Sequence, residues 1–129
     1  MNKTWIKEHW LEILLCVGVL IQIVALAVFN LTRLPYESNY DSSCAYAQIV
    51  EMWKQKSLLL KDWSYQTTLG IDSPVILGAL FYGVTKNAFT AFGLANIVTV
   101  IIYVGLFYDI LKQADVAKNM RLLAVLFLL

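Results

Sequence analysis

The feature that most constrains this chain is an almost wholly apolar run over residues 11–30, LEILLCVGVLIQIVALAVFN. About 20 residues of α-helix cross the hydrocarbon core of a bilayer, so this run is long enough for one membrane span. Residues 1–10 carry Lys3, Lys7 and two tryptophans, a pairing that is typical of a membrane–water interface. A cleaved signal peptide is the alternative, but the run is longer than the usual apolar region and no small-x-small site clearly follows it. We therefore predict a cytoplasmic N-terminus over 1–10 and an uncleaved first span over 11–30.

Composition points to the same class. The chain is 60% hydrophobic and 15% charged, whereas a soluble domain is about half apolar and a quarter charged. No basic run follows the phosphate spacing of a nucleic acid, so we exclude nucleic-acid binding. The cysteines and the one histidine show no zinc-ligand spacing, so we predict no metal residues. We expect an all-α, multi-pass protein of the cell membrane.

Residues 31–72 form the one long polar stretch. Within it, four apolar side chains recur at i, i+3, i+4 and i+7, which is one face of a helix: Tyr46, Ile49, Val50 and Trp53. We predict an extracytoplasmic loop that contains an amphipathic helix from about 42 to 56, lying on the membrane surface. The alternative is a helix packed on a soluble domain, for which 42 residues are few.

The chain becomes apolar again after this loop. Pro74 suits the first turn of a helix, because its missing N–H group is not needed there. The remaining sequence predicts four segments: a short second span at 73–86, a third span at 88–110, a polar connection at 111–121 and the start of a truncated fourth span at 122–129. Because eight apolar residues cannot span a bilayer, we expect the N-terminal piece of a longer protein. A small protein with a hydrophobic C-terminal anchor is the alternative.

Basic residues do not settle the orientation. With the N-terminus in the cytoplasm and every span crossing, three lysines lie inside and seven basic residues lie outside, against the positive-inside rule. If 73–86 does not cross fully, the counts become five and five.

Two motifs stand out, one inside the polar loop and one at its end. Asp41-Ser42-Ser43-Cys44-Ala45-Tyr46-Ala47 places an acid at the head of the amphipathic helix, and Asp72-Ser73-Pro74 leads into the next apolar segment. This layout resembles the start of the GT-C membrane glycosyltransferases, which use polyprenyl-phosphate-linked sugars and include protein O-mannosyltransferases and lipid A aminoarabinose transferases. Ser42 stands where that family often has a second acid, and one proline stands where two are common.

The resemblance implies a site and its partners. Asp41 would be the general base that takes a proton from the acceptor hydroxyl, a role that suits a carboxylate within hydrogen-bond distance. Cationic groups would stabilise the lipid-phosphate leaving group. The expected substrate-binding residues are Asp72, Tyr46, Arg33 and Lys61. The implied partners are a polyprenyl-phosphate-linked sugar donor, a lipid, protein or glycan acceptor, and membrane lipid. No cofactor is implied, the requirement for a divalent metal stays open, and we expect the piece alone to be inactive.

Other interpretations of these residues stay open at this stage. Asp41 is also a good N-cap residue for a helix, since its oxygen can accept from the N–H two or three residues later. Asp72 is equally explained as an acid at the start of a helix. A second class of function is a non-catalytic membrane protein, or a segment of a transporter or flippase. Substrate pathways usually place ionisable residues inside spans, and these spans are nearly free of them.

Overall fold

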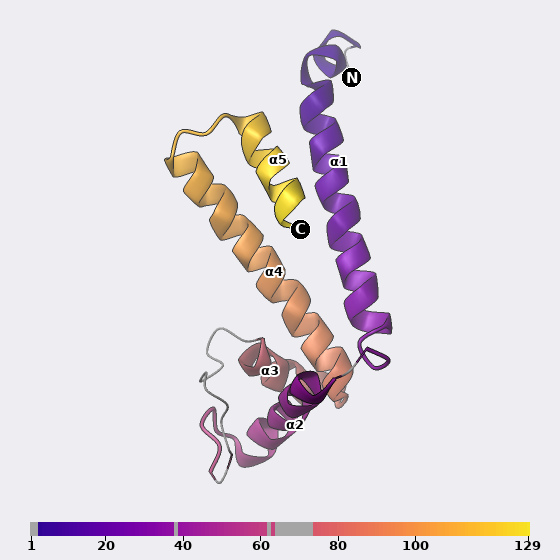
Figure 1. The fold of residues 1–129 in the computed structure, drawn as a ribbon, viewed down its shortest axis with the longest axis vertical. Coiled ribbons are helices and arrows are strands. Elements are labelled where there is room, and N and C mark those ends of the chain that lie inside the picture. The colour runs from indigo at the N-terminus through magenta and orange to yellow at the C-terminus, as the bar shows by residue number, and fades with distance from the viewer. Residues whose placement is uncertain (1–2, 38, 62, 64–73) are drawn as a thin grey trace. The chain divides into compact units, whose positions relative to one another are not determined.

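The computed structural model describes residues 3–37, 39–61, 63 and 74–129, without the side chains of residues 3–8, 40 and 41. These residues form helices and connections, and no strand occurs among them. The helices are α1 (Lys3–Thr32), α2 (Tyr40–Gln55), α3 (Val75–Thr85), α4 (Ala88–Gln113) and α5 (Lys118–Leu128), as Figure 1 shows. The predicted all-α class is therefore confirmed for the part of the chain that is described.

Two of these helices are long and apolar enough to cross a membrane. They are His9–Thr32 within α1, with a mean hydropathy of 2.7, and Ala88–Gln113, with 2.0. At 1.5 Å per residue their 24 and 26 residues extend about 36 and 39 Å, and a hydrocarbon core is about 30 Å thick. Only 6% and 17% of their most apolar windows are buried, whereas the core helix of a soluble protein would be mostly buried.

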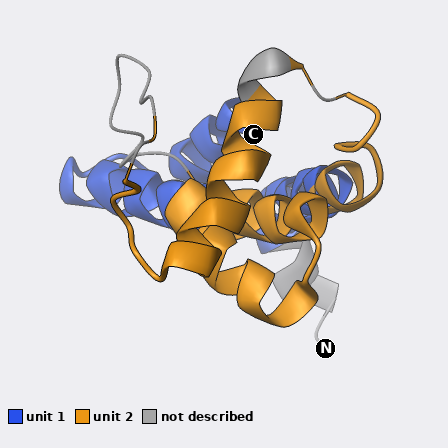
Figure 2. Ribbon diagram, turned by 90° about the horizontal axis from the view of Figure 1, so that it is seen from below, with its two compact units in different colours: residues 1–26, 100–129 blue, residues 27–99 orange. Residues whose placement is uncertain are grey.

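The chain divides into two compact units, coloured separately in Figure 2. Unit 1 comprises residues 1–26 and 100–129. Within it, the Lys118 ammonium pairs with the Glu12 carboxylate, and Leu126 lies against Gly18, where an added β-carbon would be 3.0 Å from a leucine methyl. The Arg121 guanidinium lies 5.0 Å from the centre of the Tyr108 ring. The contacts of Lys118 and Leu126 hold α5 to the N-terminal half of α1, and the contact of Arg121 holds α5 to α4.

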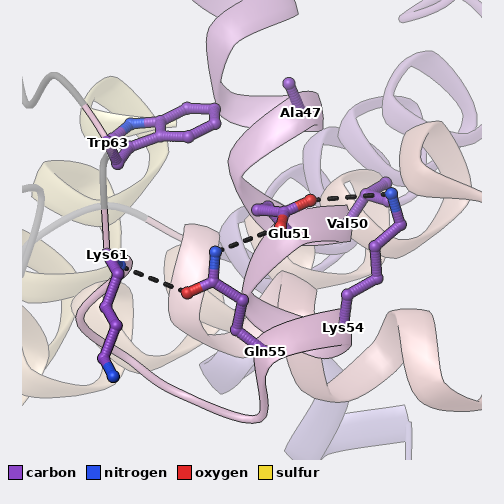
Figure 3. A pocket seen from close by; sticks show the side chains of 7 residues that line it. All are labelled: Ala47, Val50, Glu51, Lys54, Gln55, Lys61 and Trp63. Carbon is purple, nitrogen blue, oxygen red and sulfur yellow. Dashed lines mark hydrogen bonds and ion pairs between the residues drawn. The ribbon is translucent and has the colours of Figure 1, made fainter.

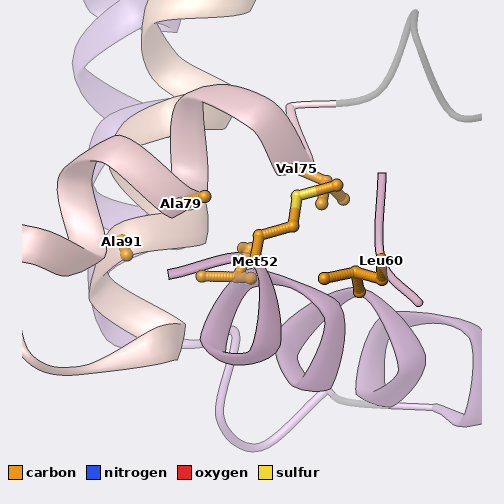
Figure 4. Close-up of a cluster of buried hydrophobic side chains, with 6 residues drawn as sticks. Met52, Leu60, Val75, Ala79 and Ala91 are labelled. Carbon is orange, nitrogen blue, oxygen red and sulfur yellow. The ribbon is translucent and has the colours of Figure 1, made fainter. Parts of the chain in front are cut away.

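Unit 2, residues 27–99, has its core between α2 and α3. Its buried side chains gather from both helices, from the segment after α2 and from the start of α4, as Figure 4 shows: Ile49, Met52, Leu60, Val75, Ala79 and Ala91. Ile49 is fully buried, and its side chain occupies the space that a β-carbon on Gly78 would need. The absence of a side chain at this position therefore allows α3 to approach α2 closely.

Most of the apolar face of α2 packs on protein within unit 2, whereas the sequence predicted that this face lies on the membrane surface. Tyr46 and Ile49 are 6% and 0% exposed. Trp53 is more open, but its ring lies against Gly83 of α3. Sequence periodicity identifies which face of a helix is apolar, but it does not identify what covers that face.

A polar contact joins the end of α1 to the start of α4 in the same unit. The Asn96 side-chain amide donates to the Asn30 side-chain oxygen at 2.9 Å, and Asn30 is only 6% exposed. One turn earlier on α4, Gly93 lies directly against the backbone carbonyl of Asn30. Glycine permits this close approach, and the half-buried Asn96 amide gives the buried Asn30 side-chain oxygen a hydrogen-bond partner.

The helix boundaries extend several of the expected segments. The first helix begins at Lys3 and ends at Thr32, beyond the expected 11–30 on both sides. The polar segment 111–121 is mostly helical, since α4 continues to Gln113 and α5 begins at Lys118. Hydropathy identifies the part of a helix that can contact lipid. The helix itself can continue into polar residues on either side, because its ends need further backbone or side-chain partners.

Candidate functional site

Asn39, and not Asp41, caps the start of α2. The Asn39 side-chain oxygen accepts from the backbone N–H of Ser42 at 2.9 Å, and the Ser42 hydroxyl accepts from the Asn39 backbone N–H at 2.8 Å. This reciprocal arrangement is a capping box. The interpretation of Asp41 as the N-cap residue is therefore wrong, and the pattern Asn39-x-x-Ser42 was the signal for the cap that we missed.

Asp41 is the second residue of α2, and the structure describes its backbone but not its side chain. It follows the end of α1 at Thr32 by nine residues, so it lies close along the chain to an apolar helix long enough to span. The first turn of a helix carries a partial positive charge from its free N–H groups.

Tyr46 lies in the core of unit 2. Its ring makes edge contacts with two rings of α4, at centroid distances of 4.6 Å to Phe89 and 5.3 Å to Phe92. Burial raises the pKa of the Tyr46 phenol above its ordinary value of 10.0, because the phenolate would lose its hydration. The nearby Ser42 side chain partly offsets this rise in pKa, although no hydrogen bond of ordinary geometry reaches the hydroxyl among the described residues. The Tyr46 ring is therefore buried in the structure. The resemblance had implied that Tyr46 contacts the substrate, which would need an accessible side chain.

Arg33 belongs to the short connection between α1 and α2. Its backbone N–H donates to the carbonyl of Phe29, and its own carbonyl accepts from Tyr36 and Glu37 at 2.9 and 3.2 Å. The Arg33 side chain is exposed. Arg33 is therefore the described cation closest along the chain to Asp41, on the same connection that leads into α2.

Lys61 lines a groove on the other half of α2. The groove has a volume of about 550 Å³, and Figure 3 shows its lining side chains: Ala47, Val50, Glu51, Lys54, Gln55, Lys61 and Trp63. The Gln55 amide donates to Glu51 at 3.1 Å and accepts from the Lys61 backbone N–H at 3.2 Å, while the Lys54 ammonium lies 3.5 Å from the Glu51 carboxylate. This arrangement orients a carboxylate and an amide beside an indole ring. Their i, i+3 and i+4 spacing on α2 was the sequence signal for this face.

The structure does not bring all of the expected site residues together. Asp41 precedes Glu51 by ten residues of helix, which is about 15 Å along the axis, so the groove at Lys61 is separate from the start of α2. Asp72 lies outside the described residues. No group of three or more histidine, cysteine, aspartate or glutamate side chains gathers within the described part of the chain in a way that could hold a metal ion.

Comparison with models of known protein families, with curated proteins and with solved structures found no match. The candidate site therefore stands on the residues of this chain alone.

Proposed function

We propose that this chain is the N-terminal part of an integral-membrane glycosyltransferase that transfers a sugar from a polyprenyl-phosphate donor to an acceptor hydroxyl. In this proposal α1 and α4 both cross the membrane, and Asp41 is the general base. The resemblance to the GT-C enzymes supplies the reaction.

The observation that carries the proposal is the cap at Asn39. Because Asn39 occupies the N-cap position of α2 and forms a capping box with Ser42, Asp41 is not the N-cap residue. An acid remains in the first turn of a helix, a few residues beyond an apolar helix long enough to span. A donor held in lipid and an acceptor that arrives from water can meet at this position.

The supporting cations lie on either side of α2 along the chain. Arg33 stands before the helix, on the connection from α1, and is available to the phosphate of a lipid-borne donor. Lys61 stands in the separate groove, about two helical turns or more from Asp41 along α2, where it would contact the acceptor and not the leaving phosphate. The proposal thus assigns Arg33 to the donor side and Lys61 to the acceptor side.

Replacement of Asp41 by asparagine tests the proposal. In the full-length protein, expressed in membranes, we expect the Asp41→Asn variant to lose transfer of tritiated mannose from polyprenyl-phosphate mannose by a factor of about 10²–10⁴, the usual contribution of a general base. The asparagine has nearly the same shape, so insertion into the membrane and helix content should not change.

Glu37→Gln is the matched control, because Glu37 is an exposed acid on the same connection and has no role in the proposal. It should transfer the label at the wild-type rate. A rate for Asp41→Asn equal to that of Glu37→Gln would refute Asp41 as the base. The same result with Asp41→Ala would favour a non-catalytic membrane protein.

A further inference from the structure

Helix α3 is too short to cross a bilayer. Its 11 residues extend about 16 Å, roughly half the thickness of the hydrocarbon core. It is nonetheless apolar throughout, with the sequence VILGALFYGVT. Such a helix must be covered on every side by protein or by lipid.

Both ends of α3 touch the same short part of α2. Val75, at its start, belongs to the buried cluster with Met52, and Figure 4 shows these two side chains against each other. At the other end, the Trp53 ring lies against Gly83, and the Lys86 ammonium is 4.8 Å from the centre of that ring. Because Met52 and Trp53 are adjacent, both ends of α3 lie within side-chain reach of the same turn of α2, the turn that carries these two residues.

The turn of α2 that carries Met52 and Trp53 lies outside the hydrocarbon core. The same turns of α2 carry Glu51, Lys54 and, at its end, Lys56, and the last two are exposed. Charged side chains are excluded from the bilayer centre unless they are paired and buried. A helix that crossed the membrane would carry one of its ends far from α2, to the opposite surface, and α3 does not.

The side of α3 that faces away from α2 is a second apolar face. Its exposed members are Leu80 and Val84, which lie one helical turn apart at i and i+4. Leu80 is 61% exposed and Val84 is 86% exposed. Only Lys86 and Asn87 separate α3 from the apolar helix α4, so a membrane that contains α4 begins beside this face.

We infer that α3 does not cross the membrane but lies in one leaflet. Its outer face contacts lipid, and the Lys86–Asn87 turn lies on the same side of the membrane as α2. The inference uses the membrane insertion of α1 and α4 from the proposed function, but it does not depend on any chemistry at Asp41. α1 and α4 then form the two spans among the described residues, and the connection 114–117 lies on the side opposite to α2.

The structure offers three matched positions for a test. Lys56, Lys86 and Asp115 are all exposed, and all have left-handed backbones, with φ of 50°, 53° and 55°. A cysteine at each position therefore meets the same backbone constraint. Each would be introduced singly after replacing the two native cysteines, Cys16 and Cys44, by alanine.

Labelling with a membrane-impermeant maleimide in sealed vesicles, before and after permeabilisation, reports the side of each cysteine. We expect Lys56→Cys and Lys86→Cys to label from one side and Asp115→Cys from the other. Labelling of Lys86→Cys together with Asp115→Cys, on the side opposite to Lys56→Cys, would show that α3 crosses and would overturn the inference. Labelling of all three from one side would overturn it too, because α4 would then not cross.

The lipid contact needs a separate measurement. A bimane fluorophore on Leu80→Cys or Val84→Cys should be quenched by phosphatidylcholine that carries a doxyl group near its headgroup, whereas bimane on Lys54→Cys should not. Equal quenching at the three positions, or none at Leu80→Cys and Val84→Cys, would show that water or protein covers this face and would refute lipid as its partner. Undiminished sugar transfer in Asp41→Asn would refute Asp41 as the base but would leave these labelling and quenching results unchanged, so the two proposals fail separately.

Discussion

Gly93→Ala probes the contact between α1 and α4. A β-carbon at this position would lie 2.5 Å from the carbonyl oxygen of Asn30 and 3.1 Å from its carbonyl carbon. Both atoms belong to the backbone, so no side-chain rotation relieves the clash. Ordinary van der Waals contact begins at 3.4 Å, so α4 would have to move away from α1 by about 0.9 Å, the difference between 3.4 and 2.5 Å.

This movement would also break the polar contact one turn later. The hydrogen bond from Asn96 to Asn30 is 2.9 Å long, and an extra 0.9 Å takes it beyond the hydrogen-bonding range. A hydrogen bond between membrane helices contributes about 0.6–1.7 kcal/mol. Overpacking costs about 1–3 kcal/mol, and alanine returns about 0.5–1 kcal/mol through its higher helix propensity. We therefore expect Gly93→Ala to lower the free energy of unfolding by about 1–4 kcal/mol.

Gly105→Ala is the matched control on the same helix. No described atom lies within 4 Å of a β-carbon at Gly105, so alanine there should stabilise the protein by about 0.5–1 kcal/mol. The assay is equilibrium unfolding in mixed micelles of dodecyl sulfate and a mild detergent, followed by far-ultraviolet circular dichroism. If Gly93→Ala is as stable as Gly105→Ala, the close contact with Asn30 is refuted. In an Asn96→Ala background the loss caused by Gly93→Ala should shrink, because the hydrogen bond is already absent.

Two further predictions concern α2. Asn39→Ala should cost about 0.5–2 kcal/mol by removing the cap, and it should speed amide hydrogen exchange at Ser42; unchanged exchange there would contradict the capping box. Burial raises the pKa of Tyr46, so the folded state keeps the phenol proton after the unfolded state has lost it, and the free energy of unfolding should fall as the pH rises above 10.0. In Tyr46→Phe the free energy of unfolding should no longer fall in this way, and the phenolate absorbance at 295 nm that develops at the highest pH should be missing. An unchanged pH dependence of stability in that variant would refute the attribution of the fall to Tyr46.

Much of the helical layout could be predicted from local patterns. Long apolar runs require helices, because a bilayer leaves backbone groups no other partners, and α1 and α4 follow the runs at 11–30 and 88–110. The amphipathic pattern predicted a helix from about 42 to 56, and the structure has α2 at Tyr40–Gln55, close to both predicted ends. These signals are local in sequence, so one chain is enough to detect them.

The contacts between helices could not be predicted in the same way. Gly78, Gly83 and Gly93 make close contacts, but Gly105 makes none among the described residues, and the four glycines look alike in sequence. Which residue caps α2 depended on one hydrogen bond, since the stretch from Asn39 to Ser43 offers several good capping residues.

The candidate site, like the fold, could be predicted only in part from the sequence. The sequence identified Asp41 and Lys61 as residues of interest, but it did not show that a helix separates them by several turns or that the Tyr46 ring is buried. Burial and separation depend on how α2 packs against α3 and α4, which is a property of residues far apart in the chain.

The central claim is that Asp41 takes a proton in sugar transfer. Its most direct test measures donor binding and transfer on the same sample, with the Asp41→Asn variant of the full-length protein in nanodiscs and tritiated polyprenyl-phosphate mannose. We expect the variant to retain the labelled donor as the wild type does, while the label that reaches the acceptor falls at least about 100-fold. Transfer within threefold of wild type, or loss of donor binding together with transfer, would contradict the assignment of Asp41 as the base.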